Sequence, residues 1–261
     1  MNNNQYLELS EDGKTLFRCD KETVGEISIP KGVSEIWNGA FSDCTSLTSV
    51  EIPSSVTLIG RDAFIGCSSL ISVEIPYSVT VIRTMVFQNC TSLKSIMIPD
   101  SVTEIKAWSF AGCTSLTTML IPNSVTMIGN GAFMGCTSLS KVVISSRVTK
   151  IERVSFSGCK SLTMVEIPSS VIEIGNSAFN GCTSLTSIKL PINITNIWGN
   201  AFLGCTSLTE LHLRHRKPKD FSKGFDGLDL SKITLYVPIG SGYDYRHHPF
   251  YRKFAKVVIE E

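Results

Sequence analysis

Apolar positions recur along most of this chain at a fixed spacing of 23 residues. Every copy of the pattern holds a phenylalanine and, three residues later, a cysteine. The copies begin at Ile29, Ile52, Ile75, Ile98, Ile121, Ile144, Ile167 and Leu190. A repeat of this length is typical of a solenoid, in which no coil can bury its apolar side alone and stacked neighbours share one core.

Each copy also predicts its own local elements. Residues 70–75 end in alternating apolar positions, which indicates a short strand, and Pro76 then ends the ladder because proline has no N–H to donate. Val79 and Ile82 predict a second short strand on the opposite side. The stretch 60–67 is too short for a long helix, so we expect one turn of α or 3-10 helix that places its phenylalanine on the core.

The repeated phrase IP-x-SVT-x-IG-x-x-AF-x-GCTSLT resembles the BspA-like (treponemal-type) class of bacterial leucine-rich repeats. The expected fold is therefore an α/β repeat: a right-handed leucine-rich-repeat solenoid of eight 23-residue coils, capped at both ends. The resemblance further implies a module for adhesion or for binding host or matrix proteins. We expect no enzymatic activity and no cofactor, because the repeat brings no catalytic polar groups together.

The ends of the chain depart from the repeat and predict caps, which a solenoid needs to cover its exposed apolar ends. Residues 1–28 are expected to form the N-terminal cap, with a hairpin turning at Asp12-Gly13. Residues 29–213 are expected to form the eight repeats. Residues 214–261 are expected to form a C-terminal cap that holds a basic insertion and an aromatic-rich finish, the latter folding over the last coil.

Composition and charge restrict the class of protein. A net charge of +1 gives no general attraction to nucleic acid or to an anionic membrane, and no apolar run is long enough for membrane insertion. The first residues lack the basic and apolar segments of a signal peptide, so a cytoplasmic location is expected. If the sequence has been trimmed, the alternative is that the protein is secreted or lies at the cell surface. We expect a monomer.

The residues that usually carry catalysis and metal binding are poorly placed for either role. Eight of the nine cysteines occupy the repeated core slot, where parallel thiols at strand spacing are unsuited to disulfides and hidden from substrate. His212 and His215 would face opposite sides of a strand, and the adjacent His247 and His248 would diverge. We expect no catalytic residue and no metal site.

The densest charge on the chain is the basic insertion, with Arg214, Arg216, Lys217 and Lys219 as secondary site candidates. One interpretation is a solvated loop, since loops tolerate charge. The alternative is a site for an anion or an acidic partner. No aromatic residues alternate with these cations to stack on bases, so nucleic acid is not expected as a partner.

One slot in each repeat points outward from the predicted strand, and it provides the main site hypothesis. Along the stack this slot reads Glu51, Glu74, Met97, Leu120, Val143, Glu166, Lys189 and His212. The slot two residues earlier places Met164 diagonally beside Val143. We expect Met97, Leu120, Val143 and Met164, flanked by Glu74 and Glu166, to bind a protein partner.

Two kinds of alternative remain open at this point. The apolar residues in the outward slot could reflect only the preference of strands for valine and leucine. For function, the alternatives are a glycan or cell-surface attachment module and an intracellular scaffold without an extracellular ligand. A glycan site would favour exposed aromatic side chains, and neither slot holds one in the eight repeats.

Overall fold

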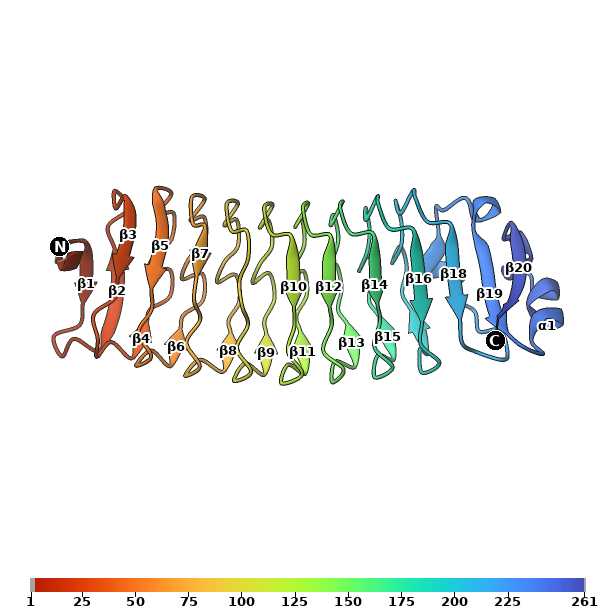
Figure 1. Ribbon diagram of the computed structural model, residues 1–261, viewed down its shortest axis with the longest axis horizontal. Coiled ribbons are helices and arrows are strands. Elements are labelled where there is room, and N and C mark those ends of the chain that lie inside the picture. Colours follow the sequence, from red (N-terminus) through yellow and green to blue (C-terminus); the bar gives the residue numbers. More distant parts are fainter. Residues whose placement is uncertain (1–2, 261) are drawn as a thin grey trace.

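The computed structural model describes residues 3–260, and in these residues the chain winds as a solenoid of stacked coils with the two termini at opposite ends (Figure 1). This confirms the predicted leucine-rich-repeat architecture. The first two residues of the expected N-terminal cap and the last residue of the expected C-terminal cap lie outside the described part of the chain.

Short parallel strands line two sides of the solenoid. We call the first side the strand face; its strands are β3 (Gly25–Ser28), β5 (Leu47–Glu51), β7 (Ser72–Val73), β10 (Thr118–Leu120), β12 (Lys141–Val143), β14 (Met164–Glu166), β16 (Ser187–Leu190), β18 (Glu210–Leu213), β19 (Thr234–Pro238) and β20 (Lys256–Glu260). The second side, the opposite face, carries β4 (Glu35–Ile36), β6 (Leu58–Ile59), β8 (Val81–Ile82), β9 (Glu104–Ile105), β11 (Met127–Ile128), β13 (Lys150–Ile151), β15 (Glu173–Ile174) and β17 (Asn196–Ile197). Equivalent residues of neighbouring coils pair in register, as Leu120 does with Val143.

The strand face is interrupted once, where the regular pattern predicts a strand. Residues 93–98 form no strand, so β3-β5-β7 and the ladder from β10 to β20 are separate sheets. The backbone hydrogen bonds at this coil are long, at 3.4 Å from the Lys94 amide to the Ile71 carbonyl and 3.3 Å from the Thr117 amide to the Lys94 carbonyl. The main chain around Met97 is therefore held less tightly than that of its neighbours.

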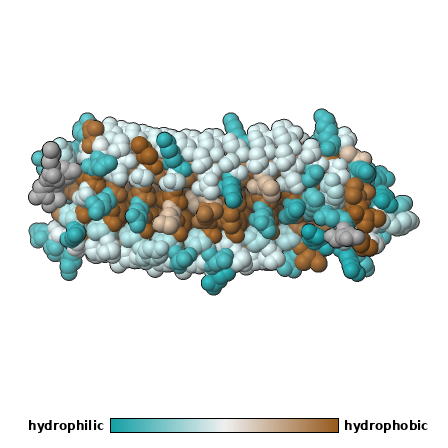
Figure 2. Space-filling model, viewed as in Figure 1, coloured by the Kyte–Doolittle hydropathy of each residue, from teal (hydrophilic) through white to brown (hydrophobic). Residues whose placement is uncertain are grey.

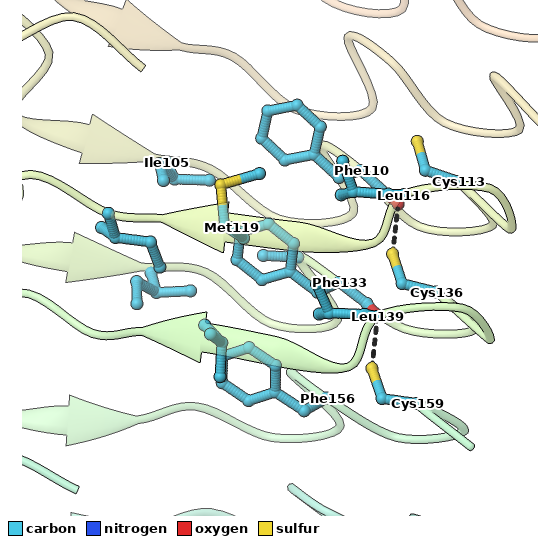
Figure 3. Packing of buried hydrophobic residues seen from close by; sticks show 14 of the residues in the cluster. Ile105, Phe110, Cys113, Leu116, Met119, Phe133, Cys136, Leu139, Phe156 and Cys159 are labelled. Carbon is cyan, nitrogen blue, oxygen red and sulfur yellow. Dashed lines mark hydrogen bonds between the residues drawn. The ribbon is translucent and has the colours of Figure 1, made fainter. Parts of the chain in front are cut away.

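A continuous stack of phenylalanine rings forms the centre of the core. All eight repeat phenylalanines are fully buried, and adjacent ring centroids lie 4.8–5.5 Å apart in nearly parallel planes. Figure 3 shows Phe110, Phe133 and Phe156 stacked in this way beside Leu116 and Leu139. The repeated apolar slots thus become one core that runs the length of the solenoid.

The segment that carries each phenylalanine is a series of turns, so the expectation of a helical turn there is wrong. In the coil at Phe64, Asp62 and Gly66 have φ angles of +57° and +71°. A right-handed helix requires negative φ, and two left-handed residues in five prevent it from propagating. Within residues 3–260 the helices lie near the two ends: η1 (Asn3–Tyr6), η2 (Ser222–Phe225), η3 (Leu230–Lys232), α1 (Gly242–His247) and η4 (Tyr251–Lys253).

The cysteines are buried and free, as the repeat position predicts. From Cys67 to Cys205, each thiol donates a hydrogen bond of 3.0–3.3 Å to the carbonyl oxygen of the phenylalanine in the preceding coil. Two of these bonds, from Cys136 to Phe110 and from Cys159 to Phe133, are drawn in Figure 3. Burial raises the pKa of the Cys136 thiol to about 12, so it is not a nucleophile near neutral pH.

At the N-terminal end, the predicted hairpin is present. Strand β1 (Leu7–Leu9) pairs antiparallel with β2 (Thr15–Cys19), and β2 pairs parallel with β4 of the first repeat. Residues 25–28, which were expected to belong to the cap, form strand β3, and this strand pairs with β5 and begins the strand face. The hairpin therefore covers one end of the core while the strand face starts beside it.

At the C-terminal end, the stack continues beyond the eight predicted coils. Phe225 stacks on Phe202 with ring centroids 5.0 Å apart, and the Phe202 amide donates to the Gly224 carbonyl at 3.0 Å. Strands β18 and β19 pair in register as well. The basic insertion therefore belongs to a further coil of the stack, which the predicted count of eight coils omits.

The aromatic finish closes the stack, with one exception. Tyr245, Phe250, Tyr251 and Phe254 are buried, whereas Tyr243 is 71% exposed. Strand β20 completes the ladder against β19. The end of the core is thus covered by α1, η4 and β20 together.

Candidate interaction surface

The apolar residues predicted to face outward do lie exposed on the strand face. Met97, Leu120 and Val143 are 65%, 59% and 46% exposed, and Met164 is 64% exposed. We call these four residues the apolar row. Leu120 pairs with Val143, Val143 pairs with Glu166, and Met164 stands two residues before Glu166 on β14. Figure 2 shows an apolar band running lengthwise over this side of the molecule, bordered by polar residues.

A hollow of about 550 Å³ lies next to the C-terminal half of the apolar row. Val143 and Met164 line it together with Lys141 and Glu166. A hollow with apolar walls and a few charged groups at its rim can take up a protruding side chain of a partner. Such a hollow depends on side-chain shapes, and the repeat pattern gave no indication of it.

Acidic residues border the apolar row at both ends. Glu74 lies one coil before Met97, and Glu166 lies one coil after Val143. Both side chains are exposed, and neither takes part in an ion pair within residues 3–260. The arrangement is an apolar strip between free carboxylates, as the slot analysis predicts.

The opposite face of the described residues also carries exposed apolar side chains, among them Phe17 and Trp37, whose rings meet edge to face. Its exposed apolar side chains include Met127 and Ile172, which are 36% and 45% exposed and lie two coils apart. Met127 pairs in register with Glu104, so a charged residue adjoins it. The apolar row differs from these residues in that its members lie on four successive coils.

Aromatic and charged groups meet at the C-terminal end of the outward slot. The His212 ring stacks on Tyr236 with centroids 4.4 Å apart, and its Nδ1 lies 2.7 Å from Oε2 of Glu260. Sequence reasoning missed this contact because Glu260 is 48 residues away and belongs to the last strand. No group of three or more His, Cys, Asp or Glu side chains in residues 3–260 is arranged to hold a metal ion.

The basic insertion is anchored to the repeats, although its Arg and Lys side chains are exposed, as in a solvated loop. Both the Nε2 of His215 and the ammonium of Lys219 donate to the Ile194 carbonyl, at 3.0 and 2.9 Å. The Tyr245 hydroxyl donates to the His215 carbonyl at 2.9 Å, and the Tyr251 hydroxyl to the Lys219 carbonyl at 2.7 Å. Lys219 thus has a structural contact, while the exposed side chains of the insertion project from a fixed backbone.

We expect His215 to make the folded state sensitive to mild acid. Burial, followed by the charge of Lys219, lowers the pKa of His215, and its Nδ1 is buried without a partner. As pH falls, His215 is therefore protonated in the unfolded chain before it is protonated in the folded one. The free energy of unfolding should fall as pH drops below about 6.5, the ordinary pKa of histidine. Urea unfolding at pH values on either side of that point checks this. The variant His215→Gln, which keeps a donor but cannot titrate, should show a weaker pH dependence; an equal dependence would contradict the assignment.

Comparison with known proteins shows that the chain is similar to leucine-rich repeat proteins of bacteria. It is similar to the leucine-rich repeat protein of T. pallidum, with 34% identity and a TM-score of 0.62 over 69% of this chain and 86% of that one. Two further structures show the same fold. A leucine-rich repeat protein from Bacteroides ovatus has 24% identity and a TM-score of 0.66 over 97% of this chain and 74% of that one. A leucine rich cell surface protein from Faecalibacterium prausnitzii has 23% identity and a TM-score of 0.52 over 98% of this chain and 93% of that one.

No curated protein matches the chain significantly. Among the described residues, no helix has the length and apolar character needed to cross a membrane. The family model for the BspA type leucine rich repeat region matches residues 13–140 and 126–240. The chain belongs to the BspA-type leucine-rich repeat family, whose repeats form binding scaffolds of the protein-interaction or surface type.

Proposed function

We propose that this protein is a non-enzymatic protein-interaction module that binds its partner on the strand face, through the apolar row. The observation that carries the proposal is the exposure of Met97, Leu120, Val143 and Met164 on four successive coils between free carboxylates, with Leu120 and Val143 paired in register. An apolar strip of this kind is costly in water, and covering it with a partner recovers that free energy. Extended solenoid faces are a usual binding surface of repeat proteins.

Adhesion to a host or matrix protein is the finer form of this proposal, and the family resemblance supports it. The strand face offers shape and apolar area, while in the described part of the chain the cysteines are buried and no group of His, Cys, Asp or Glu side chains is arranged to hold a metal ion. Glycan attachment has less support. Tyr236 extends the outward slot with an aromatic ring, but that ring already stacks on His212.

Charge substitutions on the apolar row test the proposal. The double variant Met97→Glu with Leu120→Glu should weaken binding of each strand-face partner by about tenfold or more, since residues at the centre of an interface commonly contribute over 1 kcal/mol each. Pull-down followed by calorimetry on the captured partner measures this. The matched control is Met127→Glu with Ile172→Glu, which places the same charges on exposed apolar positions of the opposite face. Unchanged affinity of the row variant for every partner found would refute the proposal.

A further inference from the structure

A second apolar hollow lies toward the C-terminal end of the molecule and adjoins the first hollow at Ser169, which lines both. It has a volume of about 600 Å³ and is lined by Ile192 and Ile239, which are 58% and 61% exposed. Pro191, Pro238 and Leu213 are also among its lining residues. Two isoleucines this exposed beside a hollow of this size form a place where an apolar side chain can be buried.

Positive charge from the basic insertion stands at the rim of this hollow. Arg214 and Arg216 both line it, whereas Lys217 does not. The alternation follows from the extended backbone, because His215 between them points inward to the Ile194 carbonyl. The anchoring of His215 and Lys219 therefore fixes the backbone that carries both arginines beside the isoleucines, so a partner does not have to order that backbone.

These two cations are only weakly compensated within the molecule. Nη2 of Arg214 lies 3.9 Å from Oε1 of Glu260, and the other oxygen of that carboxylate is 2.7 Å from His212. Arg216 forms no ion pair among the described residues. The Glu260 carboxylate also lines the hollow, but it is shared between Arg214 and His212 and leaves Arg216 unpaired, so the rim favours an added anion.

From this combination we propose that the hollow, which we call the arginine hollow, binds an acidic-apolar peptide segment of a protein partner. A carboxylate of the segment pairs with Arg216, whose planar fork matches carboxylate geometry. A neighbouring apolar side chain of the segment lies between Ile192 and Ile239. Inorganic phosphate or nucleic acid would use the arginines but would gain nothing from the isoleucines, so an acidic-apolar peptide fits the site better. No residue of the apolar row lines this site, and the proposal does not depend on the function proposed for the row.

The test uses the full chain and a short fluorescent peptide in which aspartate and glutamate alternate with leucine. Fluorescence anisotropy should show saturable binding, and the same peptide with asparagine and glutamine in place of the acids should bind at least about tenfold more weakly, because a charge-assisted hydrogen bond is lost. Arg216→Glu should weaken binding of the acidic peptide by a similar factor. Ile239→Asn should weaken it as well, since the apolar wall is removed.

A matched control distinguishes binding of the peptide in the hollow from its general electrostatic attraction to the basic insertion. Lys217→Glu makes the same charge change one residue away and outside the hollow, and should alter binding less than about twofold, as expected of exposed charges. Leu120→Glu on the apolar row should have no effect. Circular dichroism confirms that each variant is folded. The proposal is overturned if the acidic peptide shows no saturable binding, if Lys217→Glu and Arg216→Glu act alike, or if a single-stranded oligonucleotide binds more tightly than the peptide.

Discussion

Replacement of Phe133 by alanine should lower the free energy of unfolding by about 4 kcal/mol, within the range observed for large-to-small core substitutions. Phe133 is fully buried between Phe110 and Phe156, with ring centroids 5.4 Å away on each side. The substitution removes two aromatic contacts and leaves a cavity that rigid neighbouring coils cannot fill. Urea unfolding followed by circular dichroism measures the loss.

The position of Phe133 in the stack adds a second expected effect. Each coil contacts only its neighbours, so a weak interface in the middle of the solenoid should allow the two halves to unfold separately. We therefore expect a broader transition, or two transitions, in the variant. Phe17→Ala is the matched control: Phe17 is 40% exposed on β2, and its loss should cost less than about 1 kcal/mol. Similar losses for the two variants would show that the ring stack is not the main core contact.

Replacement of Gly129 by alanine should destabilise the protein by about 2 kcal/mol, although it adds only one methyl group. A Cβ atom at Gly129 would lie 2.5 Å from the Ala107 amide nitrogen and 2.7 Å from the Lys106 carbonyl carbon. Both are backbone atoms of the adjacent coil and cannot rotate away. Relief requires the coils to separate, and this strains the hydrogen bond of 2.8 Å from the Gly129 amide to the Ile105 carbonyl.

Gly199 provides the comparison for this prediction. A Cβ atom there would meet its nearest neighbour, Nδ2 of Asn176, at 3.6 Å, which is ordinary van der Waals contact. Gly199→Ala should therefore leave stability unchanged or raise it slightly, because alanine restricts the unfolded chain. Thermal unfolding of the two variants side by side checks this difference. A neutral Gly129→Ala would mean that the coils can move apart at no cost.

Much of the fold follows from the sequence because the repeat is regular. With a constant interval, a residue's slot determines its neighbours in the adjacent coils, so the pairing of Leu120 with Val143 can be predicted by counting. The alternation within a strand then determines which side chains face water. This is why the apolar row and the buried cysteines were both predictable. The turns around each phenylalanine were not, because left-handed residues such as Asp62 leave little trace in the apolar pattern.

The features that sequence reasoning missed lie where the regularity ends or where shape matters. The insertion after Leu213 hides the further coil, because Phe225 returns at the repeat interval but the residues before it do not match the phrase. The contact of His212 with Glu260 joins residues that no interval relates. The interruption at residues 93–98 depends on hydrogen-bond lengths, to which the apolar pattern is insensitive.

By itself, the sequence determined the class of fold, the register of the coils, the burial of the cysteines and the outward direction of the apolar row, because each depends only on position within a repeat. Tertiary structure alone decided where this surface is hollowed and which cations are free to bind. Arg216 and Lys219 are equivalent in the sequence as members of one basic cluster. In the folded chain the Lys219 ammonium donates a hydrogen bond to the Ile194 carbonyl, whereas Arg216 lies at the rim of the arginine hollow. The reason is that one side of the backbone of the basic insertion meets the preceding repeat and the other side meets water.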